Sequence, residues 1–169
     1  MTLKKNSFLT IAVVCSILLA AIITSCKKTN SDSASGSLSA SLNGAAFQPV
    51  SVQGIQSKSL SYTVLTGLQV QSSDSMFLSV SIPDTMHLNQ PINLAGFTTA
   101  SVIYQNTKGT KRYVAGSGYG HGSITLTSWD STGHKIAGTF TAFLANYNIG
   151  TDSVVVSNGQ FNSSYTITP

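Results

Sequence analysis

The side chains that could carry out acid–base or metal chemistry are few and widely spaced in this 169-residue chain. The three histidines are His87, His121 and His134, and no two of them have the short spacing of paired zinc ligands. Glutamate is absent, so the common zinc site built from histidines and a glutamate cannot form. We therefore predict no metal site and expect the histidines to occupy exposed loops.

Nucleophilic and glycosidic catalysis are not supported by the sequence either. A Ser-His-Asp set that includes Asp130 can be drawn from the composition, but no G-x-S-x-G elbow is present to hold a serine. A glycosidase needs two buried acids, whereas the five aspartates all lie in polar, turn-like segments. We predict no catalytic residues and no cofactor, and hence a protein that is not an enzyme.

Two local clusters have structural interpretations. The glycine-rich segment Gly116–Gly122 lacks the Lys-Ser/Thr ending of a phosphate-binding loop and does not open a helix, so we interpret it as a flexible entry to a strand. Lys108, Lys111 and Arg112 form the only local basic cluster, which we interpret as a solvated loop. No nucleic-acid partner is expected.

Trp129 and Tyr119 are the candidates for ligand stacking, because aromatic faces can cover the apolar surface of a sugar ring. The alternative for Trp129 is core packing or the stapling of a hairpin. A carbohydrate ligand therefore stays open as one of the hypotheses.

Every aspartate in the chain is followed by a serine or a threonine, although these two types make up only 46 of the 169 residues. The pattern is similar to the Asp-Ser/Thr-apolar acceptor used for O-glycosylation in Bacteroidota. The alternative is turn chemistry, since Asp and Ser both bond to nearby backbone in turns. The candidate acceptors are Ser33, Ser75, Thr85, Ser131 and Ser153.

The first 25 residues have the composition of a secretory signal peptide. Lys4 and Lys5 provide the positive start, residues 8–23 form an apolar run, and Thr24 and Ser25 are small. A transmembrane anchor is the alternative, but a spanning helix needs about 20 apolar residues and this run is shorter.

The segment Ile23-Thr24-Ser25-Cys26 resembles the lipobox of bacterial lipoproteins. The resemblance implies that the Cys26 thiol is joined to diacylglycerol, that cleavage falls just before it, and that its amino group is acylated. Acyl chains on this residue would hold the protein on a membrane, since each buried CH₂ contributes about 0.8 kcal/mol. Cys15 is a poor rival, because Val14 is not small and the site would lie inside the apolar run.

Processing at Cys26 changes the composition of the protein. The mature chain would run from 26 to 169 with one lipidated cysteine, hence without a disulfide or a free thiol. Removal of Lys4 and Lys5 lowers the net charge from +4 to +2, because seven basic residues then face five aspartates. That length suits a single domain with a real core.

Lys27 and Lys28 bear on the side of the membrane. In Bacteroidota lipoproteins, acidic residues just after the lipidated cysteine are associated with export to the cell surface, and here the first acid is Asp32. The resemblance therefore implies an outer-membrane lipoprotein facing the periplasm, with the cell surface as the alternative. Two lysines beside anionic headgroups agree with this weakly.

The elements that must position these side chains are strands. Residues 26–37 are polar and serine-rich, which predicts a lipidated flexible tether before one domain at 38–169. From residue 38 the apolar positions recur with a period of two, typical of half-buried antiparallel strands. The predicted strand faces are Leu38, Ala40 and Leu42; Leu60, Tyr62, Val64, Thr66, Leu68 and Val70; Met76, Leu78, Val80 and Ile82; Ile124 and Leu126; Ile136, Gly138, Phe140, Ala142 and Leu144; and Phe161, Tyr165 and Ile167.

The predicted fold class is all-β, an antiparallel β-sandwich or barrel-like sheet of about eight to ten strands. Asn43-Gly44, Asp130 to Gly133 and Asn158-Gly159 are predicted to be turns, the last two of them hairpin turns. No segment of helical length after the tether has an apolar stripe of helical period.

Three short motifs resemble a domain family of unknown function found in lipoproteins of Bacteroidota. These are the opening Asn-Gly-x-x-Phe in residues 41–47, an Ile-x-Gly-Thr-Phe strand within 122–144, and a final strand with Asn-Gly-x-Phe within 154–161. The resemblance implies a β fold and a bacterial envelope location, and it carries no established activity.

Our leading hypothesis is a non-catalytic envelope lipoprotein with a β module for binding or interaction. Its partners would be membrane lipid, through the acyl chains on Cys26, and an envelope protein or a glycan. A carbohydrate-binding accessory lipoprotein and a hydrolase with a dispersed site are the alternatives. A groove lined by Trp129 and tyrosines would favour the first alternative, and a buried His-Asp pair in a pocket would favour the second.

Overall fold

A computed structural model describes residues 36–71, 74–96, 99–108, 110–148 and 151–169. The predicted signal peptide, Cys26 and Ser33 lie outside the described residues. All described residues belong to one compact unit, Ser33–Pro169. Within these ranges no helix has the length and apolar character needed to cross a membrane.

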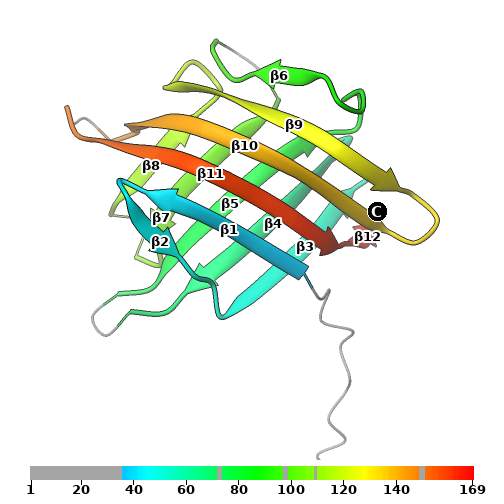
Figure 1. Ribbon diagram of the computed structural model, residues 1–169, viewed down its shortest axis with the longest axis horizontal. Coiled ribbons are helices and arrows are strands. Elements are labelled where there is room, and N and C mark those ends of the chain that lie inside the picture. Colours follow the sequence, from blue (N-terminus) through cyan, green and yellow to red (C-terminus); the bar gives the residue numbers. More distant parts are fainter. Residues whose placement is uncertain (1–35, 72–73, 97–98, 109, 149–150) are drawn as a thin grey trace, which may run out of the picture. The chain divides into compact units, whose positions relative to one another are not determined.

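The predicted all-β fold is confirmed, since the described residues form strands and connecting turns (Figure 1). The strands are β1 (Gly36–Leu42), β2 (Ala45–Phe47), β3 (Ser51–Ser57), β4 (Tyr62–Gln69), β5 (Met76–Pro83), β6 (Pro91–Asn93), β7 (Ser101–Asn106), β8 (Arg112–Ala115), β9 (His121–Asp130), β10 (Lys135–Asn146), β11 (Ser153–Ser164) and β12 (Thr166–Thr168). Twelve described strands exceed the predicted eight to ten, because β2, β6 and β12 have three residues each, too few for alternation to reveal. The first strand begins at Gly36, two residues before the predicted start of the domain.

The described strands form one mostly antiparallel sheet that folds over itself. Its order is β12-β3-β4-β5-β7-β8-β10-β11-β1-β2, with β9 beside β10 and β6 beside β9. Figure 1 shows β1, β9, β10 and β11 lying across β3, β4, β5 and β7, so the sheet has two layers. The short β8–β10 pairing at Ala145 and Asn146 makes the two layers continuous, and β12 returns to pair in parallel with β3.

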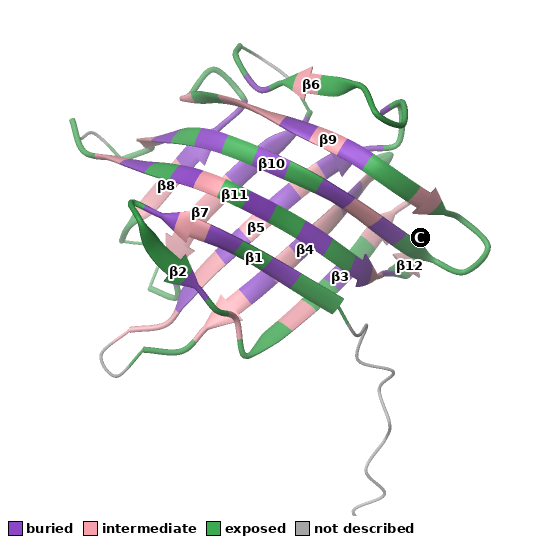
Figure 2. Cartoon of the chain, in the orientation of Figure 1, coloured by how far each residue is buried: buried purple, intermediate pink, exposed green. Residues whose placement is uncertain are grey.

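The core lies between the two layers, and the period-two pattern places it there. Along β10 the predicted face from Ile136 to Leu144 is buried while the residues between are mostly exposed. Figure 2 shows the same alternation of buried and exposed residues along β10 and β11. The predicted faces of β1, β5 and β9 are also buried. We call the layer of β1, β9, β10 and β11 the front layer. Its inner and outer faces are therefore those that the sequence pattern indicates.

The predicted buried face of β4 is wrong, because the opposite face of this strand is the one that lies against the core. Val64 and Leu68 lie half-buried on the outer face, whereas Thr63, Leu65 and Gly67 face the core. A Cβ at Gly67 would lie 3.0 Å from Leu38 Cδ2 of β1 and 3.1 Å from a Phe47 ring carbon. The large side chains of the opposite layer fill this space, so β4 contributes small residues to the core there.

Thr63 provides the first test of the fold. Its side chain is fully buried, and Oγ1 has no hydrogen-bond partner in the described part of the chain. Burial of an unpaired hydroxyl is unfavourable, so we expect Thr63→Val to raise the free energy of unfolding by about 1 kcal/mol. Denaturant unfolding measures this change.

The matched control is Thr66→Val on the same strand. The Thr66 hydroxyl lies on the outer face, 3.0 Å from the Ser79 hydroxyl, so its loss should leave stability unchanged or lower it. A Thr63→Val variant that is less stable than the wild type would contradict the account of the buried hydroxyl.

Two of the three predicted turns are confirmed. Asn43 and Gly44 connect β1 to β2 with φ of 49° and 85°, the left-handed pair that a tight hairpin requires. The β9–β10 hairpin turns at residues 131–134, where Asp130 Oδ1 accepts hydrogen bonds from the backbone N–H groups of Thr132 and Gly133 at 3.0 and 2.8 Å.

The predicted hairpin turn at Asn158-Gly159 is wrong. Both residues lie in the middle of β11, where the register against β10 shifts between the pairs Phe140–Gly159 and Ala142–Val156. Asn158 has a φ of 52°, so it occupies the irregular position of a β-bulge. A bulge and a hairpin turn use the same left-handed residue types, which is why the dipeptide alone could not separate them.

The bulge helps to build two reciprocal ring-on-glycine pairs inside the sheet. Gly138 of β10 lies directly opposite Phe161 of β11, and Phe140 lies directly opposite Gly159. A Cβ at Gly159 would lie 2.7 Å from the Phe140 ring, and one at Gly138 would overlap the Phe161 ring. Each glycine therefore makes room for a phenylalanine of the neighbouring strand, which explains the Gly-Thr-Phe and Asn-Gly-x-Phe motifs in structural terms.

Candidate functional site

Trp129, the first stacking candidate, is held by the core. It is half-buried on β9, and its indole N–H donates a hydrogen bond to the Tyr165 hydroxyl at 3.1 Å. The two rings meet edge to face with centroids 6.5 Å apart. The structure therefore supports the packing alternative for Trp129, in which it connects β9 to the chain end of β11.

Tyr119, the second candidate, is exposed and belongs to an aromatic group. Its ring lies 4.9 Å from the ring of Tyr147, and the Arg112 guanidinium carbon lies 4.5 Å from the Tyr147 ring centre. The position of Tyr119 follows from the backbone, because it pairs with Gly116 in an isolated bridge just before β9. The glycine-rich segment thus places the aromatic side chain of Tyr119 just before the start of β9.

Sequence reasoning missed a third aromatic feature, on the outer face of the front layer. His121 of β9, Phe143 of β10 and Val155 of β11 are direct cross-strand neighbours. The rings of His121 and Phe143 lie nearly parallel with centroids 5.1 Å apart. Phe143 is 37% exposed and Val155 is 49% exposed, so this row presents apolar surface to solvent.

A signal for Phe143 was present in the sequence. Phe143 has the same parity as Thr139 and Thr141, so alternation places it on the polar outer face of β10 and not with the core residues. A large aromatic side chain on such a face has no core to fill, which distinguishes it from Phe140 on the inner face.

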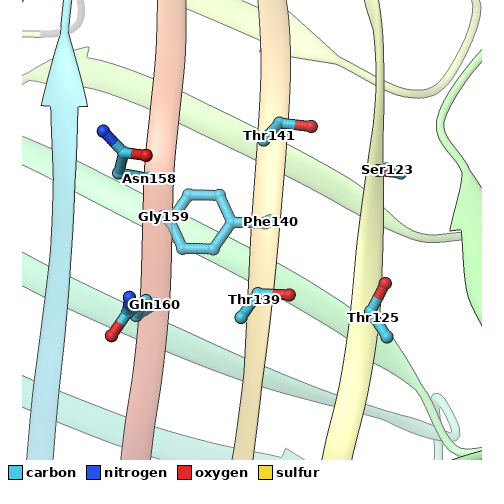
Figure 3. A pocket seen from close by; sticks show the side chains of 8 residues that line it. All are labelled: Ser123, Thr125, Thr139, Phe140, Thr141, Asn158, Gly159 and Gln160. Carbon is cyan, nitrogen blue, oxygen red and sulfur yellow. The ribbon is translucent and has the colours of Figure 1, made fainter. Parts of the chain in front are cut away.

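Polar side chains on one side of this row line a shallow hollow of about 270 Å³ over β9, β10 and β11. Figure 3 shows them on three adjacent strands around Phe140 and Gly159. None of them forms a side-chain hydrogen bond within the described part of the chain. The six side chains are Ser123, Thr125, Thr139, Thr141, Asn158 and Gln160.

Two further hollows continue this surface past the aromatic row. One, of about 550 Å³, is lined by Pro91, Asn93 and Ala95 of the β6 region together with His121 and Ser123. The other, of about 340 Å³, includes Phe143 and Val155 among its lining residues. All three hollows share Thr141, so they form one surface, which we call the outer groove. No Asp, Lys or Arg of the described ranges lines it.

The three histidines are exposed, as predicted. His87 lies in the segment after β5 and His134 in the β9–β10 turn, whereas His121 is the first residue of β9 and not a loop residue. Among the described residues, no three His, Cys, Asp or Glu side chains lie close enough together to hold a metal ion.

The four described aspartates all accept hydrogen bonds from neighbouring segments. Asp74 accepts from the Asn106 amide at 2.7 Å, Asp84 from the Gln56 amide at 3.3 Å, and Asp152 from the Tyr113 hydroxyl at 2.7 Å. With the Asp130 turn, these bonds account for every described aspartate as a turn or loop residue.

The hydroxyl residues that follow these aspartates differ in exposure. Thr85 and Ser131 are exposed, while Ser75 and Ser153 are partly buried at the starts of β5 and β11. O-glycosylation of these residues stays a prediction, and Thr85 and Ser131 are its most accessible candidates.

Asp152 gives a pH-dependent prediction. Hydrogen bonds from the amide of Asn146 and from the hydroxyl of Tyr113 lower the pKa of Asp152, and the same carboxylate raises the pKa of Tyr113. A carboxyl whose folded-state pKa is depressed stabilises the fold above its unfolded pKa of about 4, and this contribution is lost as the pH falls through the folded value. We expect Asp152→Asn to melt at a lower temperature than the wild type at pH 7, with the difference shrinking below about pH 4.

Thermal melting at pH 7 and pH 3 measures this effect. Asp84→Asn is the control. The Gln56 amide donates to the Asp84 carboxylate over 3.3 Å at an exposed position, which is a longer contact than the 2.7 Å bond from Tyr113 to Asp152. A difference between wild type and Asp152→Asn that stays constant down to pH 3 would contradict the assigned role.

Comparisons of the chain with protein-family models, curated proteins and solved structures found no match. The resemblance to a lipoprotein domain family of Bacteroidota therefore stays a prediction that depends on the motifs alone. The function must be inferred from the geometry of the outer groove and from the N-terminal sequence.

Proposed function

We propose that this chain is an envelope lipoprotein, anchored to a membrane through acyl chains on Cys26, whose β domain is a non-catalytic binding module. The observation that supports this most is the exposed row of His121, Phe143 and Val155 beside polar side chains that form no side-chain hydrogen bond within the described ranges. An apolar patch rimmed by polar groups on a surface is typical of a binding site.

The outer groove is suited to binding because strands hold it. Most of its side chains stand on β9, β10 and β11, which pair over most of their lengths and pack on the core with their other faces. Side chains on paired strands are positioned before a ligand arrives, so little conformational entropy is lost on binding.

No observation favours the hydrolase alternative. That hypothesis needs a buried His-Asp pair, and in the described ranges His87, His121 and His134 are all exposed. The aspartates there accept hydrogen bonds from amides, two hydroxyls and the backbone, and no histidine is among these donors.

The anchor is tested with Cys26→Ala in the full-length precursor. We expect the wild type to incorporate an alkyne-labelled fatty acid and to sediment with membranes, and the variant to lose the label and stay at precursor size. Cys15→Ala is the matched control, since a cysteine inside the apolar run should be dispensable. A labelled, normally processed Cys26→Ala protein would disprove lipidation at this residue.

For the location we propose the outer membrane with the domain facing the periplasm, because Lys27 and Lys28 follow Cys26 and the first acid is Asp32. The cell surface is the alternative. Protease added to intact cells should then leave the domain uncut until the outer membrane is permeabilised. Digestion in intact cells would place the domain on the surface instead.

A further inference from the structure

We propose that the outer groove binds a neutral glycan, with Phe143 as the principal contact and the hydroxyl and amide side chains of β9, β10 and β11 as hydrogen-bonding partners. This inference rests on the proposed function, because it names the ligand class of the same binding surface. It is argued from three features of the groove: its aromatic row, its polar groups and its lack of charge.

The aromatic row supplies apolar surface at one end of the groove. Phe143 has no core to fill, yet it is held between His121 at 5.1 Å and Val155 on the next strand. Tyr119 and Tyr147 form a second exposed aromatic pair close by along the chain. Sugar rings have apolar C–H faces, and aromatic side chains bury such faces while losing little conformational freedom.

The polar groups match a ligand that offers hydroxyls on many sides. Thr139 and Thr141 are separated by one residue on β10, hence by about 7 Å, and the flanking strands lie about 5 Å away. The resulting grid presents hydroxyls from Ser and Thr, which donate and accept, and amides from Asn158 and Gln160, which do both with separate atoms. A polyhydroxylated ligand can satisfy such a grid in several registers.

The lack of charge selects a neutral ligand. Among the described residues no lysine or arginine lines the groove, so an acidic polysaccharide or a nucleic acid would find no counter-charge from them there. A protein partner would need a larger apolar centre than one phenylalanine and one valine provide. A neutral glycan requires no ion pair and fits a shallow, open surface that carries both polar and apolar groups.

The test is affinity electrophoresis of the full-length protein, solubilised in a polyoxyethylene detergent so that no sugar headgroup competes. The gels contain laminarin, starch, galactomannan or xyloglucan as neutral probes and alginate as an acidic probe. We expect retardation by at least one neutral probe and none by alginate. Phe143→Ala should lower the association constant about tenfold, and Thr141→Val about threefold.

Ile55→Ala is the matched control, since Ile55 is also 37% exposed but lies on β3 in the other layer. It should bind like the wild type, and all variants should melt within a few degrees of the wild type. Retardation by no neutral probe, retardation by alginate alone, or equal binding by Phe143→Ala would each overturn the inference. Fatty-acid labelling of Cys26 is measured separately. If no glycan binding is seen on these gels, the proposal of a lipid-anchored protein is therefore not affected.

Discussion

Replacing Gly138 by valine should lower the free energy of unfolding by about 3 kcal/mol or more. A Cβ at this position would overlap both the Phe161 ring and the backbone carbonyl oxygen of Thr125. The ring could rotate away, but the carbonyl belongs to the neighbouring β9 strand and cannot move without disturbing the ladder. The variant must therefore separate two strands or displace a buried ring.

Denaturant unfolding of Gly138→Val measures this cost, and Ala137→Val is its control. Ala137 is the preceding residue on β10 and is directed to the opposite, partly exposed face, so its enlargement should change stability by less than about 0.5 kcal/mol. A Gly138→Val protein as stable as the Ala137→Val protein would show that the β10–β11 interior is less tightly packed than described.

The alternation rule succeeded where one face of a strand is mostly polar and exposed to solvent and the other is apolar and buried. In β10 the inner face from Ile136 to Leu144 is continuous and apolar, so its direction could be predicted from residue types alone. It failed on β4, where Val64 and Leu68 lie outside and Thr63 and Gly67 lie inside. Which face of β4 is buried depends on the large side chains that the opposite layer places there, and a local pattern does not contain this information.

The bulge in β11 could not be predicted for a similar reason. Asn158-Gly159 has the residue types of a tight turn, yet pairing with β10 and with β1 continues on both sides of it. The dipeptide specifies a left-handed backbone position and nothing more. Whether the chain reverses there depends on partners that are distant in sequence.

The structure separates the two residues that were predicted as stacking candidates, Trp129 and Tyr119. Trp129 is held by the Tyr165 hydroxyl and the core, whereas Tyr119 is exposed and lies against Tyr147. Phe143 was not among the predicted candidates, and phenylalanine is usually a core residue. Its parity along β10 separates it from Phe140, and this check of face against residue type would have found it.

The two phenylalanines of β10 should therefore have opposite phenotypes. Phe140 is 2% exposed, lies opposite Gly159 and has its ring 6.4 Å from that of Phe161. The Phe140→Ala variant removes the ring of the Phe140–Gly159 pair and leaves the Gly138–Phe161 pair without this neighbouring ring. We expect it to lower the free energy of unfolding by about 3 to 5 kcal/mol, as a buried ring replaced by a cavity does.

Phe143→Ala, three residues further along the same strand, should cost less than about 1 kcal/mol, because the ring already meets solvent. Denaturant unfolding of both variants under one condition compares inner and outer face with the chemical change held constant. If Phe143→Ala is as destabilising as Phe140→Ala, the outer row is part of the packing and not a surface available to a ligand. If it is nearly neutral, the exposed ring contributes little to the fold, and a function outside the fold becomes the reason to hold it there.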